Sequence, residues 1–241
     1  MEWQDRRRTA HRLGRVQEHL KQIVYGGNDG IVTTFAIVAG FAGAAAEGVA
    51  QIGAVAVLVF GLANLFADAV SMGLGEFLSA RSQADLYHAR RHGTRHDIAS
   101  NPEAERAGLV AILRRRGLPL PEAEDTATII ARHPDFMADL VMTYDTGLSD
   151  PADDTPALNG LVTFASFVVF GVVPLVPYFL FKPMDGTFTL SVAATLLALT
   201  ILGLIRWNAT GERPLRCVGE TVSVGTICAI VAYTVGWLVG G

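Results

Sequence analysis

The stretch Gly61-Leu-Ala-Asn-Leu-Phe-Ala-Asp-Ala-Val-Ser-Met-Gly-Leu-Gly-Glu-Phe-Leu-Ser-Ala-Arg81 decides the fold. It is apolar for most of its length, yet Asn64, Asp68, Met72 and Glu76 recur within it at every fourth residue. In a helix, which turns by about 100° per residue, this spacing places the four side chains along one slowly turning face. The stretch therefore predicts a membrane-spanning helix with one polar face.

Further apolar runs lie on both sides of this stretch. The 241 residues are 51% hydrophobic and only 17% charged, and the net charge of −4 gives no reason to expect nucleic-acid binding. A spanning helix needs about 20 mostly apolar residues. Five runs qualify, at about 31–46, 52–78, 158–181, 188–207 and 217–239. The expected fold class is an all-α membrane protein with five transmembrane helices per subunit.

Arginine is distributed unevenly between the connections. It is frequent before the first span, between the second and third spans, and between the fourth and fifth. Because positively charged loops stay inside, we expect a cytoplasmic N-terminus and an external C-terminus. The Ala- and Arg-rich composition favours a bacterial inner membrane over a vacuolar one. The expected parts are a cytoplasmic segment 1–24, helices 1–2 in 25–80, a small helical cytoplasmic domain in 81–157, and helices 3–5 in 158–241.

The polar face of the second span has the chemistry of a metal site. Ionisable groups at membrane depth are costly and usually face a cavity or the bundle interior. Carboxylates with a thioether are suitable donors for a divalent transition metal, which makes Asn64, Asp68, Met72 and Glu76 candidate ligands. In the alternative interpretation, the two carboxylates form internal salt bridges or hydrogen bonds and Met72 only packs.

Asp29 stands near the start of the first span. Local sequence favours a helix N-cap for it, because Asp is a preferred capping residue. It can also be a second carboxylate that faces the polar side of the second span. The local pattern leaves both possibilities open.

Histidines repeat on the predicted cytoplasmic extension of the second helix. His88 and His92 are four residues apart, a spacing at which two imidazoles can chelate a metal. A solvated helix face is the more ordinary interpretation. The chain contains no phosphate-binding loop, nucleophile elbow or dinucleotide fingerprint, so we expect neither an enzyme nor a bound cofactor.

Two motifs, Tyr25–Phe35 and Ala69–Tyr87, resemble those of the vacuolar iron transporter family, and the resemblance covers nearly the whole chain. It implies homodimers of five-helix subunits that export Fe²⁺ or Mn²⁺ by proton antiport, along a path between the first two helices of both subunits. Asp29 and Met72 match residues of that path. The insert matches a metal-gathering domain whose ligand pattern falls on Asp97, Glu105, Met142 and Asp145.

The sequence departs from the family pattern at several of these places. Asn64 replaces a glutamate of iron-transporting relatives, and Asp68 stands one turn later. In the insert, Thr94, Gly108 and Val141 replace glutamates and a methionine. The insert is therefore expected to bind metal more weakly, to use His88 and His92, or to prefer Co²⁺ or Zn²⁺. A membrane-bound metal sensor or storage partner without a transport cycle remains the alternative function.

Overall fold

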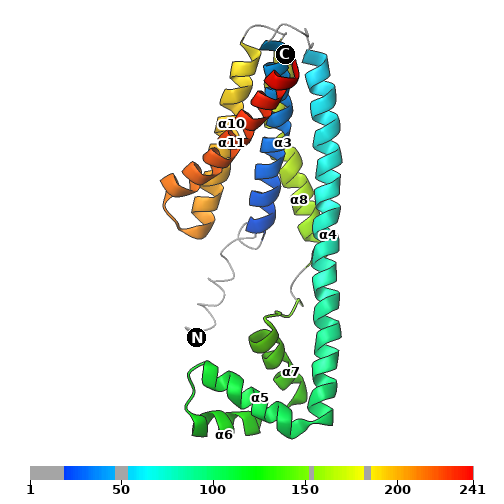
Figure 1. Cartoon of the computed structure of the whole chain (residues 1–241), viewed down its shortest axis with the longest axis vertical. Coiled ribbons are helices and arrows are strands. Elements are labelled where there is room, and N and C mark those ends of the chain that lie inside the picture. Colours follow the sequence, from blue (N-terminus) through cyan, green and yellow to red (C-terminus); the bar gives the residue numbers. More distant parts are fainter. Residues whose placement is uncertain (1–18, 47–53, 152–154, 182–185, 241) are drawn as a thin grey trace, which may run out of the picture. The chain divides into compact units, whose positions relative to one another are not determined.

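The computed structural model describes residues 19–46, 54–151, 155–181 and 186–240. Every regular element in these ranges is helical (Figure 1). The elements are α3 (Leu20–Ala46), α4 (Ala54–Ser100), α5 (Pro102–Arg115), α6 (Leu120–Ile130), α7 (Pro134–Val141), the π-helical turn η1 (Met142–Thr146), α8 (Pro156–Gly171), the 3₁₀ turn η2 (Val173–Leu175), α9 (Val176–Leu180), α10 (Thr187–Thr210) and α11 (Pro214–Gly240). The all-α prediction is confirmed.

The chain forms two compact units. The first contains residues 1–77 and 157–241, and the second contains residues 78–156. The second unit coincides closely with the predicted insert 81–157. Helix α4 continues without a break to Ser100, as the polar extension of the second span predicted.

Four stretches are long and apolar enough to cross a membrane: Val55–Ser100, Pro156–Leu180, Thr187–Thr210 and Pro214–Val239. They correspond to the last four predicted spans. Helix α3, of 27 residues, is not among these four stretches, which are counted over the described residues alone. Four of the five predicted spans are thus present as long apolar helices, and the first stays a prediction. The predicted start of the second span at Ile52, and residues 1–18 of the N-terminal segment, lie outside the described residues.

The third predicted span is not one continuous α-helix. Helix α8 ends at Gly171, and a 3₁₀ turn around Pro174 leads into the short helix α9. Prolines lack the N–H that a continuing helix needs, so the pattern of backbone hydrogen bonds changes here. The carbonyl of Pro174 instead accepts a hydrogen bond from the Ser191 hydroxyl of α10 at 2.6 Å, which ties the break to a neighbouring helix.

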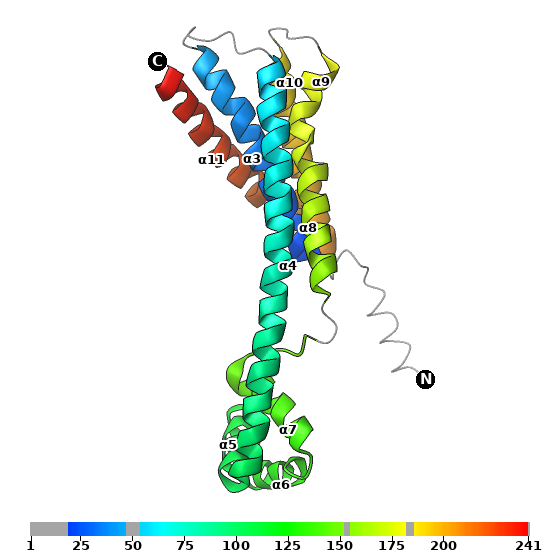
Figure 2. The same ribbon diagram turned by 90° about the vertical axis from the view of Figure 1, so that its right-hand side faces the viewer.

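Helices of the first unit approach one another closely at glycines. A Cβ atom added to Gly73 of α4 would lie 3.0 Å from the carbonyl oxygen of Gly160 in α8. Figure 2 shows these two helices side by side. Gly30 of α3 likewise lies directly against the backbone of Phe167 in α8. Small residues at such crossings allow close helix packing, as is usual in membrane bundles.

The second unit has its own apolar core. Its buried side chains come from α4, α5, α6 and α7, and they are Ile98, Leu109, Ala127, Ile130, Met137 and Ala138. Gly117, at a φ of 101°, follows the end of α5, where a side chain would be strained. The regular elements of this unit are all helical, as the predicted small helical domain requires.

Candidate functional site

The four predicted ligands of α4 lie on one half-buried face of the first unit. The Nδ2 atom of Asn64 donates a hydrogen bond of 2.6 Å to Oδ2 of Asp68. Because the two residues are one helical turn apart, the amide fixes the orientation of this carboxylate within its own helix. Asn64 thus orients the Asp68 carboxylate through Oδ2, and this hydrogen bond does not involve Oδ1.

Asp29 is not an N-cap. It lies well inside α3, which begins at Leu20, and its backbone carbonyl accepts a hydrogen bond from the Thr33 hydroxyl at 2.7 Å. The capping interpretation is wrong because the helix extends two turns further upstream than the apolar pattern indicated. Asp29 lies close enough to Asp68 for their negative charges to repel each other. Carboxylates of two different helices therefore lie within range of each other's charge in this unit.

Glu76 is held by two residues of α3 that sequence reasoning did not select. Its Oε1 atom accepts hydrogen bonds from Gln22 at 3.0 Å and from Lys21 at 3.2 Å. Gln22 is buried, and its position seven residues before Asp29 places both on one helical face. That spacing was the signal available in the sequence. Glu76 therefore has the salt bridge that the alternative interpretation expected.

Met72 is partly buried and packs against an apolar cluster formed by Leu65, Ala69 and Phe167. The packing role considered for its side chain is therefore present. A thioether in such surroundings is a soft donor with few competing polar groups nearby. A metal role for Met72 stays a prediction.

In the second unit, several predicted ligands already have partners. The sulfur of Met142 is completely buried and accepts a contact of 3.6 Å from the Thr94 hydroxyl. The carboxylate of Asp145 pairs with Arg115 at 2.9 Å. The Met142 sulfur and the Asp145 carboxylate, two ligands implied by the resemblance, thus already contact Thr94 and Arg115.

The remaining predicted ligands of this unit do not converge. His88, His92 and Asp97 are exposed on α4, and Glu105 is half-buried on α5. Gly108 is exposed and Val141 half-buried, so neither contributes a donor side chain. Among the residues that the structure describes, no three His, Cys, Asp or Glu side chains are grouped so as to hold a metal ion.

Comparison with known proteins places this arrangement in a family. A sequence model described as the VIT family matches residues 20–237. The chain is 33% identical over 217 residues to "Vacuolar iron transporter 1" of Oryza sativa subsp. japonica, covering 90% of this chain and 83% of that protein. It is 34% identical over 217 residues to "Vacuolar iron transporter 1" of Arabidopsis thaliana, covering 90% of this chain and 84% of that protein.

A protein of a third organism is also similar. "Vacuolar iron transporter" of Toxoplasma gondii is 33% identical over 230 residues, covering 92% of this chain and 74% of that protein. All three relatives are named as transporters, which is not an enzymatic role. The family match spans the described α3 to α11, including Asp29 and the polar face of α4. This chain belongs to the VIT family.

Proposed function

We propose that this protein is a divalent transition-metal transporter that exports Fe²⁺ or Mn²⁺ from the cytoplasm. The observation that carries the proposal is the meeting of Asp29 and Asp68, from two helices, beside the amide of Asn64. Two carboxylates in a membrane-embedded unit are costly unless they serve a cation. The names of the relatives support iron as the cargo.

The proposal includes a second copy of the chain. A groove of about 890 Å³ runs between α3, α4 and α11, and Asn64 is part of its lining. Its walls carry small residues, among them Gly40 of α3 and Ala63 and Ala67 of α4, which let another helix approach closely. Transition metals take four or more ligands, and one subunit offers too few here. A homodimer across this groove would double the carboxylates to four.

Direction and coupling follow from the same groups in this proposal. The arginine-rich connections place the second unit in the cytoplasm, so metal reaches Glu76 first and Asp68 and Asp29 afterwards. Protonation of these carboxylates from the more acidic external side weakens metal binding and releases the ion. Antiport is then competition between protons and metal for the same oxygens. The host membrane is a bacterial inner membrane rather than a vacuolar one.

In the second unit, two of the expected ligands bind metal only where the ion displaces a resident partner. Asp145 is available after Arg115 moves away, and the Met142 sulfur after Thr94 does. His88 and His92 are already exposed and need no such displacement. Metal gathering by this unit is therefore expected to be weak, with Asp97 and Glu105 as further ligands.

Flux into acid-inside proteoliposomes tests the proposal. Wild-type protein should move Fe²⁺ and Mn²⁺ inward, with Co²⁺ and Zn²⁺ as comparison ions. Asp29→Asn and Asp68→Asn should lower the rate by more than about 100-fold, because the loss of a supporting residue alone costs about 10–100-fold. Asp125→Asn, at an exposed carboxylate of α6, is the matched control. Metal binding without flux would favour a sensor or storage partner, and wild-type flux in Asp29→Asn would overturn the site.

A further inference from the structure

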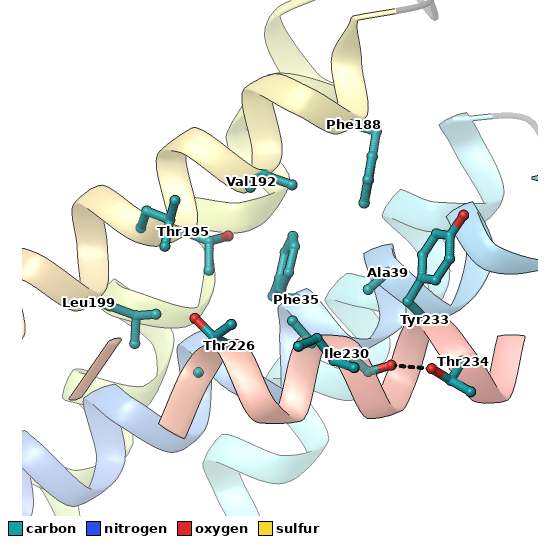
Figure 3. Close-up of a pocket in the computed structure, with 13 residues that line it drawn as sticks. Phe35, Ala39, Phe188, Val192, Thr195, Leu199, Thr226, Ile230, Tyr233 and Thr234 are labelled. Carbon is teal, nitrogen blue, oxygen red and sulfur yellow. Dashed lines mark hydrogen bonds between the residues drawn. The ribbon is translucent and has the colours of Figure 1, made fainter. Parts of the chain in front are cut away.

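A pocket of about 350 Å³ lies between α3, α10 and α11, away from the candidate metal site (Figure 3). Near their connection the last two helices pack closely, where Gly203 meets Val218 and Gly225 meets Leu199. Beyond these contacts the two helices diverge, as Figure 2 shows. The pocket fills the space that this divergence opens.

The lining of the pocket is apolar even at its three threonines. Thr195, Thr226 and Thr234 each donate their hydroxyl to the backbone carbonyl four residues earlier, at 2.8 Å. The methyl groups of these threonines are therefore the atoms that a ligand in the pocket can contact. Phe35 and Phe188 stack with ring centroids 6.3 Å apart and form part of the wall. Such a lining offers little to an ion or a polar metabolite, and it suits a hydrocarbon.

The position of the pocket brings it into contact with lipid. Both α10 and α11 are membrane-spanning stretches, and the rim residues Leu196 and Ile230 are 42% and 62% exposed. The α10 wall from Phe188 to Leu199 rises by about 16 Å. Half of a hydrocarbon core that is about 30 Å thick has nearly the same depth. Trp237 follows on α11, and an exposed Trp is typical of the membrane–water interface.

We propose that this pocket is a lipid site that holds one acyl chain of a phospholipid. The lipid comes from the leaflet around the N-terminal end of α10 and the C-terminal end of α11. Its chain lies against Phe35 and Ala39 of α3 and keeps the last two helices apart. Because the pocket opens to the bilayer and its threonine hydroxyls are engaged, an acyl chain fits it better than any water-soluble ligand.

Native mass spectrometry tests the proposal on full-length protein. The protein is taken from vesicles of phosphatidylethanolamine and phosphatidylglycerol into mild detergent. Wild type should retain one phospholipid per subunit through washing. Ala229→Phe, which fills the pocket, should lower that occupancy at least tenfold. Ala193→Phe adds the same ring to an exposed position of α10 outside the lining, so its occupancy should equal that of wild type.

Cross-linking of wild-type protein keeps the test independent of how Ala229→Phe folds. A phospholipid with a photoreactive acyl chain should label the peptides of Leu196 and Ile230 in preference to other exposed apolar faces. Uniform labelling, equal lipid retention by both variants, or cross-links between the pockets of two copies would each overturn the proposal. Neither readout depends on metal flux, so failure here is distinct from failure of the proposed function.

Discussion

Replacing Gly30 by alanine tests how α3 is fixed against α8. A Cβ at this position would lie 3.0 Å from both Cα and the carbonyl carbon of Phe167, and closer still to its carbonyl oxygen. Carbon atoms prefer separations of about 3.5–4.0 Å, so the two helices must move apart locally by roughly 0.5–1 Å. The contact is with backbone, which cannot rotate away as a side chain can. Gly30 and Phe167 are both buried, so no solvent gap absorbs the methyl group.

The expected cost can be estimated from two opposing effects. Overpacking of a well-packed site costs about 1–3 kcal/mol. Alanine in place of glycine within a helix recovers about 0.5–1 kcal/mol. The net loss for Gly30→Ala is therefore about 1–2 kcal/mol. Gly75→Ala is the matched control, because no other atom lies within 4 Å of its added Cβ, and only the gain of about 0.5–1 kcal/mol applies.

Thermal unfolding in mild detergent, followed by tryptophan fluorescence, measures both variants. For a chain of this length, 1 kcal/mol corresponds to a change of roughly 2–4 °C in Tm. Gly30→Ala should lower Tm by roughly 2–8 °C and Gly75→Ala should raise it by roughly 1–4 °C. Because the added Cβ of Gly30→Ala would displace α3, which carries Asp29, while that of Gly75→Ala meets no neighbouring atom, metal flux should fall in the first variant only. Equal Tm values for Gly30→Ala and wild type, or a comparable loss in Gly75→Ala, would refute the reasoning.

Three further predictions concern the second unit. Arg115→Gln removes the ion-pair partner of Asp145, so calorimetric titration should show severalfold tighter Mn²⁺ binding than in wild type. The control Arg114→Gln should bind Mn²⁺ with wild-type affinity. Equal affinities in all three proteins would show that the Arg115–Asp145 pair does not compete with metal. Burial and nearby negative charges raise the pKa of Tyr87, so the neutral form is favoured in the folded state and stability should decline as pH rises above about 10, the pKa of a free Tyr. Tyr87→Phe should remove that decline in alkaline unfolding curves, and an unaltered curve would contradict it. Leu109→Ala, at a core position that is 1% exposed, should destabilise the unit by about 2–5 kcal/mol and expose residues 78–156 to limited proteolysis, whereas wild-type resistance would contradict that estimate.

The elements of the fold were largely predictable because hydrophobic runs and start signals are local properties. The last four spans, the extension of α4 to Ser100 and the start of α5 at Pro102 all follow from neighbouring residues. The hydrogen bond between Ser191 and the Pro174 carbonyl joins two different helices, so no local pattern predicts it. The sequence predicted a later start for α3 than the structure shows, because polar residues such as Asn28 and Asp29 are typical of a helix end rather than of a helix interior.

The candidate site was predictable along one helix and unpredictable between helices. The four-residue steps from Asp68 through Met72 to Glu76 on α4 gave their common face directly. The partners Gln22 and Lys21 come from more than fifty residues away, and no local pattern encodes that approach. The same holds for Arg115 and Asp145, whose pairing depends on how the second unit packs. Contacts between elements far apart in the sequence decide which predicted ligands already have a protein partner.

The packing of α3 against α11 has a consequence for biosynthesis. Gly43 lies against the backbone of Tyr233, and Gly236 against that of Gly40, so the first described helix is completed by the last one. An aspartate at the centre of an inserting helix costs about 3 kcal/mol, and α3 carries Asp29. Until α11 has been translated, α3 lacks the neighbour that covers its glycine face. Final assembly of the bundle must therefore wait for α11, and a chain truncated before α11 would leave the glycine face of α3 uncovered.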